Sequence, residues 1–312
     1  MDDKERGMAE GFTGALSGLR PLALSDLQRY KDALNQANRI CWQQYFPYLH
    51  FRYADLLFTE IDGSFCLFHE LPRVDRPPKL CLYFLPIPMN PHALKLCLER
   101  VRAFNNQKRA EICWVDEEDI GMLQKLEAQL QVIAKEEEYV YDPKAYRSLS
   151  GSRKYEIRQD VKRIMKRGDV EVRPFEKSDI QDCISLMDEW AVLQQDKYDG
   201  RVSPRGFARR CVRQSTLFDQ KDLFGQVVLV EGKIRSVAFA GEIREGLASL
   251  FIGYSDHKIN GLNRFQNYHL MLRLEAYDLV NSAYATTPGL KYAKESFCPI
   301  LKHTLYRVHV TG

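Results

Sequence analysis

Two distant stretches of the chain share one short pattern. Residues 19–28 read LRPLALSDLQ and residues 172–181 read VRPFEKSDIQ, so that Arg-Pro, Ser-Asp, Gln and the apolar positions beside them coincide. A proline ends a short strand, and Ser or Asp offers an N-cap to the helix that follows. We interpret the pattern as a duplication, which predicts two domains of similar fold. The alternative is a coincidence between two helix starts.

Length and composition agree with two globular domains. The chain has 312 residues, 45% of them hydrophobic and 28% charged, which suits two domains of ordinary size. The formal net charge of +3 is too small to indicate a partner, so any such argument rests on where the charges gather. Residues 1–17 start acidic, lack an apolar signal core and are predicted to be a disordered tail. No apolar run reaches the roughly 18 residues of a membrane span.

The cysteines and acids give no metal-binding pattern. The eight cysteines form no C-x-x-C pair, which argues against zinc-finger and thioredoxin-like sites. Most of them lie in apolar runs, as buried thiols of a reducing cytosol do. The acidic run over residues 116–119 favours a helix N-terminus. We therefore expect no metal ion and no bound cofactor.

The second half is dominated by three strands and a helix. The strands are predicted over residues 224–230, 234–243 and 248–254, where apolar and β-branched residues gather. A helix is predicted to begin at Gly261 and to extend to residue 280, because apolar residues recur at helical spacing.

The first half has a compatible order of elements. A hairpin is predicted around Asp62-Gly63, and helices over residues 91–105 and 119–135. Strand, helix, three strands, helix, strand and helix is an order that resembles acyltransferases of the acetyltransferase (GNAT) type, in which spread central strands and a helix N-terminus receive the acyl donor. The resemblance predicts an α+β fold with two tandem acetyltransferase (GNAT)-like domains, each a mixed, mostly antiparallel sheet flanked by helices. The expected parts are an N-terminal domain over 18–140, a basic joint helix over 141–169 and a C-terminal domain over 170–312.

The joint helix is the most basic segment of the chain. Between residues 152 and 167, Lys154, Arg158 and Lys162 repeat at four-residue spacing, which places them on one helix face. One interpretation is a solvated face beside an apolar stripe. The sharper interpretation is a surface that binds phosphate groups, of a nucleic acid or of a lipid headgroup.

Four short motifs occur along the joint segment and the second half. They are Tyr139-Val140-Tyr141 followed by Leu149-Ser150-Gly151-Ser152-Arg153-Lys154-Tyr155 and Arg158; Gly261 followed by Asn267; Val280-Asn281 followed by Gly289-Leu290-Lys291-Tyr292-Ala293-Lys294; and Pro299. Together they resemble the C-terminal domain family of phosphatidylglycerol lysyltransferases (lysyl-phosphatidylglycerol synthases). The resemblance covers about residues 18–310. The family is similar to the peptidoglycan-bridge aminoacyltransferases in its paired acetyltransferase folds.

The resemblance implies transfer of an aminoacyl group from aminoacyl-tRNA to an amine or hydroxyl acceptor, such as a lipid headgroup. Attack on the ester carbonyl requires positioning and charge stabilisation, with little need for a covalent intermediate. Lys294 matches the lysine of the family's G-L-x-x-A-K segment, and is the candidate to stabilise the oxyanion or to hold the terminal tRNA phosphate. The implied substrate-binding residues are Gly261, Asn267, Asn281 and Tyr284, and the implied phosphate- or RNA-binding residues are Lys154, Arg158 and Lys162.

One further catalytic candidate comes from the strand pattern. Glu242 lies on the second predicted strand of the C-terminal half, where a carboxylate can act as a general base. The alternative is a partly exposed strand carboxylate without a chemical role.

The chain departs from the family just after Asn281. Many relatives carry acids there, whereas residues 282–287 read SAYATT, so no carboxylate is placed to recognise a cationic amino acid such as lysine. The membrane-spanning part of the lysyltransferases has no counterpart, so a lipid acceptor is expected to be reached by peripheral contact. The expected partners are aminoacyl-tRNA and anionic membrane lipid, and the expected location is the cytoplasm, peripheral at the inner membrane face.

Two other functions stay open. An acyl-CoA-dependent N-acyltransferase requires Q/R-x-x-G-x-G/A at the helix start, so that backbone N–H groups hold the pyrophosphate. Residues 257–263 read HKINGLN and supply one of the two glycines. The other alternative is a non-catalytic binding protein on the same fold.

Overall fold

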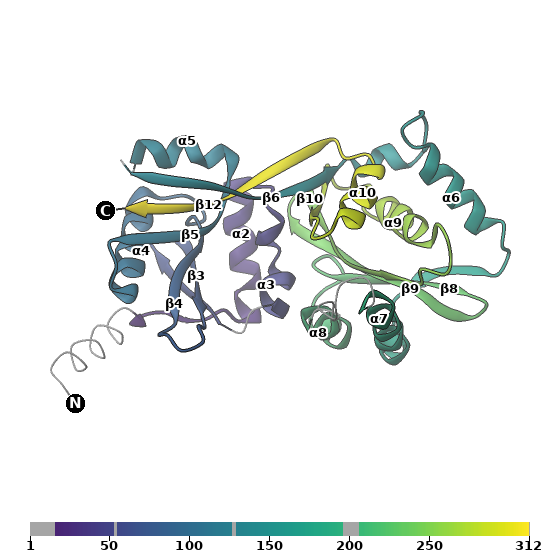
Figure 1. Cartoon of the computed structure of the whole chain (residues 1–312), viewed down its shortest axis with the longest axis horizontal. Helices are drawn as coiled ribbons and strands as arrows, with labels where there is room; N and C mark the ends of the chain where they lie inside the picture. The colour runs from purple at the N-terminus through teal and green to yellow at the C-terminus, as the bar shows by residue number, and fades with distance from the viewer. Residues whose placement is uncertain (1–15, 53–54, 127–128, 196–205, 312) are drawn as a thin grey trace. The chain divides into compact units, whose positions relative to one another are not determined.

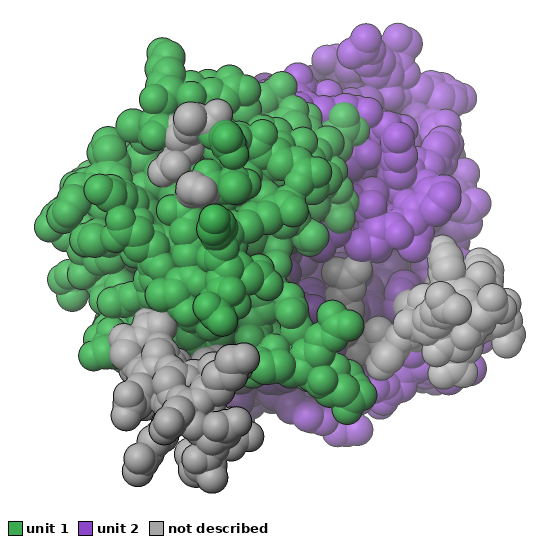
Figure 2. All heavy atoms as spheres, turned by 60° about the vertical axis from the view of Figure 1, so that its left-hand side comes forward, with its two compact units in different colours: residues 1–39, 53–137, 303–312 green, residues 40–52, 138–302 purple. Residues whose placement is uncertain are grey.

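The computed structural model describes residues 16–52, 55–126, 129–195 and 206–311. The chain forms two compact units (Figure 2): residues 1–39, 53–137 and 303–312 belong to unit 1, and residues 40–52 and 138–302 to unit 2. Residues 1–15 of the predicted tail lie outside the described residues. The domain boundaries drawn from the sequence stay a prediction. Each unit also includes a segment from the other half of the chain, residues 303–312 in unit 1 and residues 40–52 in unit 2.

Unit 1 is built on a mixed sheet with the strand order β1-β2-β3-β4-β5-β12-β6. Strands β4 and β5 run parallel, whereas β1 to β4 pair antiparallel in sequence and β12 pairs antiparallel with β5. Its elements are β1 (Arg20–Pro21), the short 3-10 turn Leu24–Asp26, α2 (Leu27–Ala37), β2 (Leu56–Ile61), β3 (Ser64–Leu71), β4 (Lys79–Phe84), α4 (Pro91–Asn105), β5 (Arg109–Asp116), α5 (Glu117–Leu126), and most of β6 (Leu130–Tyr141) and β12 (Leu301–Thr311).

Unit 2 has the strand order β7-β8-β9-β10-β11-β6. Figure 1 shows α6 and α9 on one face of β8 to β10, and α7 and α8 on the other face. Its elements are the 3-10 turn Trp42–Gln44, α3 (Phe46–Arg52), the 3-10 turn Pro143–Tyr146, α6 (Tyr155–Met165), β7 (Val170–Pro174), the 3-10 turn Lys177–Asp179, α7 (Ile180–Gln195), α8 (Gly206–Gln214), the 3-10 turn Ser215–Leu217, β8 (Phe224–Val230), β9 (Lys233–Arg244), β10 (Leu247–Ser255), α9 (Leu262–Arg273), β11 (Leu279–Tyr284) and α10 (Pro288–Ser296).

The two sheets repeat one pairing scheme. In unit 2, β7 to β10 pair antiparallel in sequence, β10 and β11 run parallel, and β6 pairs antiparallel with β11. This is the scheme of β1 to β5 and β12 in unit 1, and a helix connects the parallel pair in both units. Parallel neighbours require such a crossover. The α+β fold with two tandem acetyltransferase-like halves is therefore confirmed.

The last strand of each repeat completes the sheet of the other repeat. Strand β6 ends the first repeat, and its residues 138–141 pair with β11 of unit 2. Strand β12 ends the second repeat, and its residues 305–311 pair with β5 of unit 1. We call β6 and β12 the exchanged strands.

The repeated sequence pattern has a structural counterpart in each unit. Arg20 donates hydrogen bonds to both carboxylate oxygens of Asp26 at 2.8 and 2.5 Å, and Arg173 does the same to Asp179 at 2.7 and 2.7 Å. Each aspartate also accepts a backbone N–H from three residues before it. Because such bidentate pairs fix geometry, the pattern anchors the first strand to the turn that follows. Asp26 makes no side-chain N-cap bond to α2, contrary to the sequence expectation.

Two predicted helices end earlier in the structure. Helix α5 ends at Leu126 and helix α9 at Arg273, whereas β6 begins at Leu130 and β11 at Leu279. The polar run before Tyr139 suits a helix by local propensity, but pairing with neighbouring strands overrides a preference of this size. The predicted helix over residues 91–105 is present as α4, and Leu94, Cys97, Leu98 and Val101 form its buried face.

Candidate functional site

A cavity opens in unit 2 where β10 and β11 separate. The two strands pair only from Leu247–Ser249 to Leu279–Asn281. Beyond this point β10 stays with β9, and β11 continues beside β6. The space between them is about 300 Å³, and residues 250–254 and 282–284 line it. This volume is at the lower end of the range for small-molecule sites.

One wall of the cavity is aromatic. Trp42 and Tyr48 lie with ring centroids 4.5 Å apart, and Phe207 and Phe251 stack at 5.8 Å. Tyr48 also meets Phe207 edge-on at 5.6 Å. Phe251 lies at a register shift between β10 and β9, and a bulge of this kind re-aims a side chain. All four side chains are buried.

The segment that carries Trp42 and Tyr48 is fixed by close backbone contacts within unit 2. The hydroxyl of Tyr45 donates to the carbonyl of Asp222 at 2.6 Å. Gly241 permits this approach, because an added Cβ would lie 1.9 Å from that carbonyl oxygen and 2.5 Å from the Tyr45 hydroxyl. Arg210 of α8 donates to the carbonyl of Phe51 at 2.7 Å. The aromatic wall therefore depends on contacts between residues far apart in sequence.

Another part of the cavity lining, which we call the polar side, carries amide, hydroxyl and amine groups. It is formed by Asn263 and Asn267 of α9, Ser282 and Tyr284 of β11, Thr286 after that strand, and Lys294 of α10. The amine of Lys294 donates to the carbonyl and, at 2.9 Å, to the hydroxyl of Ser282. Burial lowers the pKa of Lys294 to about 7, although the charge of Glu138 acts in the opposite direction. Both the neutral amine and the ammonium are therefore populated near neutral pH.

Asn281 supports this side from behind. It is fully buried, and its amide donates to Glu138 at 2.7 Å and to the carbonyl of Ile40 at 2.7 Å. Its side-chain oxygen accepts the N–H of Ala283 at 2.9 Å, and Glu138 accepts the N–H of Trp42. Asn281 thus positions both the aromatic wall and the Ser282 segment without lining the cavity.

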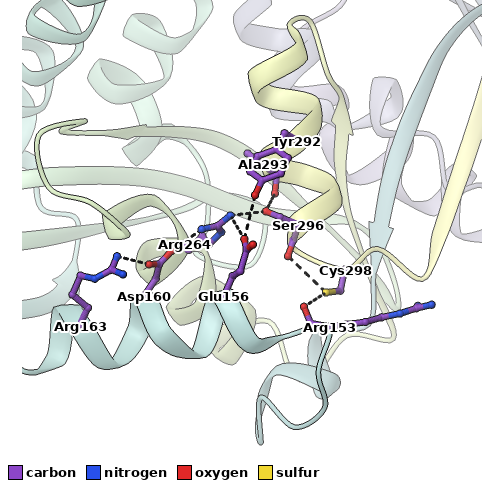
Figure 3. A network of polar contacts seen from close by, with 9 residues as sticks. All are labelled: Arg153, Glu156, Asp160, Arg163, Arg264, Tyr292, Ala293, Ser296 and Cys298. Atoms are coloured by element: carbon purple, nitrogen blue, oxygen red, sulfur yellow. Dashed lines mark hydrogen bonds and ion pairs between the residues drawn. The ribbon is translucent and has the colours of Figure 1, made fainter.

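Gly261 lies at the start of α9, against a carboxylate. Its φ of 89° is in the left-handed region, and an added Cβ would lie 2.9 Å from the side chain of Asp160. Asp160 of α6 accepts from Arg264 at 2.7 Å and from Arg163 at 2.6 Å (Figure 3). The positive end of the α9 dipole therefore already faces a negative group that belongs to the protein.

The same network ties three helices of unit 2 together. Figure 3 shows Arg264 of α9 between Glu156 of α6 and Ser296 of α10, with hydrogen bonds of 2.8 and 3.1 Å. Ser296 in turn donates to the carbonyl of Ala293 at 2.9 Å. Helix α10, which carries Lys294, is thereby held against α6 and α9.

The predicted basic face divides into two groups. The amine of Lys154 donates to the carbonyl of Ala145 and lies 4.9 Å from the ring of Tyr146. Arg158 donates to the carbonyls of Leu149 and Gly151 at 2.5 and 2.9 Å. These two side chains hold the loop before α6. Lys162 is exposed.

Two further candidates lie outside the cavity lining. Glu242 of β9 is buried and pairs with Lys221 at 3.1 Å. Burial and, in addition, the charge of Glu242 raise the pKa of Tyr277. Among the described ranges, the three residues that could jointly hold a metal ion are Cys81, Glu111 and Cys113 of unit 1, and Lys79 already pairs with that glutamate.

The sequence analysis missed the aromatic wall. Trp42, Tyr48 and Phe207 lie outside the strands and helix predicted over residues 224–280, and no local pattern links them to these elements. The structure brings Asn267, Tyr284 and Lys294 to one cavity, whereas Asn281 lies behind it and Gly261 lies at the start of α9.

Comparison with solved structures reveals similar folds over almost the whole chain. A protein of unknown function from Bacteroides thetaiotaomicron is 20% identical with a TM-score of 0.81, over 94% of this chain and 99% of that chain. The C-terminal domain of a protein designated lysylphosphatidylglycerol synthetase from Agrobacterium fabrum is 15% identical with a TM-score of 0.63, over 92% of both chains. L-PGS from Bacillus licheniformis is 15% identical with a TM-score of 0.62, over 91% of this chain and 92% of that chain.

Sequence comparison identifies the family. No curated protein sequence matches the chain. Across the part of the chain that the structure describes, none of the helices has the length and apolar character needed to cross a bilayer. A family model for the phosphatidylglycerol lysyltransferase C-terminal domain matches residues 51–312. The chain therefore belongs to the family of phosphatidylglycerol lysyltransferase C-terminal domains.

Proposed function

We propose that the protein transfers an aminoacyl group from aminoacyl-tRNA to an amine or hydroxyl acceptor, with a lipid headgroup as the acceptor that the family suggests. Family membership supports acyl transfer. The cavity at the separation of β10 and β11 supplies a place for the acyl group, with Lys294 at its polar side.

The chemistry we propose centres on Lys294. The neutral amine accepts the proton of the attacking acceptor, while the acceptor's nitrogen or oxygen forms a bond to the ester carbonyl carbon. The resulting ammonium stabilises the oxyanion and then passes its proton to the departing ribose oxygen as the ester bond breaks. A pKa near 7 suits both roles, because neither protonation state is rare. Asn263 and Asn267 offer amide groups to orient the donor.

The observation that carries the choice of donor is the contact between Gly261 and Asp160. In an acyl-CoA enzyme, the helix start would receive a pyrophosphate. Here the Asp160 carboxylate lies beside that position, and Arg264 and Arg163 are both engaged with it. A pyrophosphate would be repelled by the Asp160 carboxylate, and Arg163 and Arg264 already form hydrogen bonds to that carboxylate. This arrangement favours a donor that does not require that site.

The exposed part of the basic face is the proposed phosphate contact. Lys162 of α6 and Lys166, which caps the C-terminal end of α6, are exposed, and lysines on such a face contact backbone phosphates without reading sequence. The proposal includes action in the cytoplasm, with peripheral contact to anionic lipid at the inner membrane face when the acceptor is a lipid.

The test compares donors and acceptors separately. The protein is incubated with a pool of labelled aminoacyl-tRNAs and either phosphatidylglycerol vesicles or a small alkylamine acceptor, beside matched reactions without the protein. A parallel reaction uses acetyl-CoA with a panel of amines. We expect transfer only from aminoacyl-tRNA, and loss of that transfer in Lys294→Ala. Turnover of acetyl-CoA alone, unaffected by this substitution, would refute the proposal.

A further inference from the structure

The side chains that line the cavity include a cation but no carboxylate among the described residues. Among the described residues that line it, none is an aspartate or glutamate, and the cationic side chain is Lys294. The remaining lining residues are aromatic, aliphatic, amide or hydroxyl groups. Glu138, whose charge acts on Lys294, does not line the cavity; it is fully buried and accepts hydrogen bonds from Asn281 and the backbone of Trp42.

We infer that the cavity accepts an aminoacyl group with an uncharged, apolar side chain, aromatic or branched aliphatic, and rejects a cationic one such as lysyl. This inference rests on the proposed function and narrows its donor. It concerns the acyl side chain alone, which lies against Trp42, Tyr48, Phe207 and Phe251.

Burial of a cationic side chain at this wall would be unfavourable. An ammonium removed from water requires a charged or hydrogen-bonding partner, and the described lining offers it no carboxylate. In addition, the ammonium form of Lys294 would repel it. An apolar side chain meets neither penalty and removes its surface from water against the rings.

The arrangement of the rings does not favour a cation either. Aromatic cages for cations turn several ring faces toward one centre. Here the rings contact one another: Trp42 and Tyr48 are 4.5 Å apart, and Phe207 and Phe251 are stacked with an interplanar angle of 20°. The rings therefore pack against one another, at interplanar angles from 20° to 90°, and form an apolar wall.

The test measures binding, so that it does not depend on the acceptor. RNA minihelices ending in a 3′-amide-linked phenylalanyl, leucyl, lysyl or glutamyl group are titrated into the full-length protein by calorimetry. We expect the phenylalanyl and leucyl minihelices to bind at least about ten-fold more tightly than the lysyl one, the range typical for apolar selection in a pocket. Equal or tighter binding of the lysyl minihelix would overturn the inference and leave the proposed function intact. If none of the four binds more tightly than a minihelix without an aminoacyl group, the proposed function fails, and the inference fails with it.

A ring substitution tests the wall itself. Phe251→Leu removes a lining ring and should reduce the preference for phenylalanyl over lysyl by about five- to ten-fold. The matched control is Phe218→Leu, because Phe218 is buried in unit 2 against His50 and Phe51, outside the cavity. Phe207→Leu serves if the first variant does not fold. An unchanged preference in a folded wall variant would overturn the inference.

Discussion

The amine of Lys294 donates a hydrogen bond to the hydroxyl of Ser282 at 2.9 Å, across the gap between α10 and β11. This contact fixes the amine on the polar side of the cavity, where burial lowers its pKa to about 7. The protonation state of Lys294 therefore changes near neutral pH.

The first prediction concerns activity and pH. If the neutral amine accepts the proton, the rate of aminoacyl transfer should rise as the pH increases through about 7 and then level off. Lys294→Ala should reduce the rate about 100-fold or more and remove this rise. Lys294→Arg should not restore it, because a guanidinium stays protonated. Lys291→Ala, an exposed position on the same helix, is the control that should retain the wild-type profile.

The second prediction concerns stability and pH. The pKa of Lys294 is about 7 in the folded protein and 10.5 ordinarily, so the unfolded state binds more protons between these values. The contribution of this lysine to the free energy of unfolding should therefore increase as the pH rises from 7 to 10. Lys294→Met should flatten the dependence of stability on pH in that window, as measured by urea unfolding. A slope identical to that of the wild type would contradict the lowered pKa.

The third prediction concerns Asn281. Asn281→Asp would place a second carboxylate 2.7 Å from Glu138 in a buried site, and it would remove the donor that Glu138 and Ile40 share. We expect a loss of about 3 kcal/mol in the free energy of unfolding. Asn267→Asp is the matched control, because this asparagine is only partly buried, and it should cost much less. Comparable losses in the two variants would contradict the buried bracing role.

The fourth prediction separates the two groups on the basic face. Lys162→Gln combined with Lys166→Gln should lower the slope of log K against log salt for RNA binding by about two, with little effect on stability. Lys154→Gln should instead destabilise the loop that carries Ala145, because its amine holds that carbonyl. An unchanged salt slope in the double variant would indicate that the exposed lysines are an ordinary solvated face.

Local sequence patterns predicted the elements that build the cavity but not its aromatic wall. The strands between residues 224 and 254 follow from periodicity, and Lys294 follows from the family motif that begins at Gly289. Trp42 reaches the site because Gly241 lets Tyr45 approach the carbonyl of Asp222, a contact that no local pattern contains. Tertiary contacts of this kind become visible only when the chain is folded.

The basic face shows a second limit of sequence patterns. The four-residue spacing placed Lys154, Arg158 and Lys162 on one side of a helix. It could not show that Lys154 and Arg158 donate hydrogen bonds to backbone carbonyls of the preceding loop. The sequence alone does not distinguish a cationic side chain that bonds to backbone carbonyls from one that is free to bind a phosphate group.

The exchanged strands β6 and β12 carry a consequence for the origin of the chain. In this protein, β5 pairs with the last strand of the second repeat, and β11 pairs with the last strand of the first repeat. A polypeptide with one repeat would lack that pairing partner, and the fifth strand of its sheet would have an unpaired edge. Two copies would close both edges by trading their last strands, as domain-swapped dimers do. The present protein is equivalent to such a dimer joined into one chain. Expressed alone, residues 18–141 should accordingly self-associate in pairs.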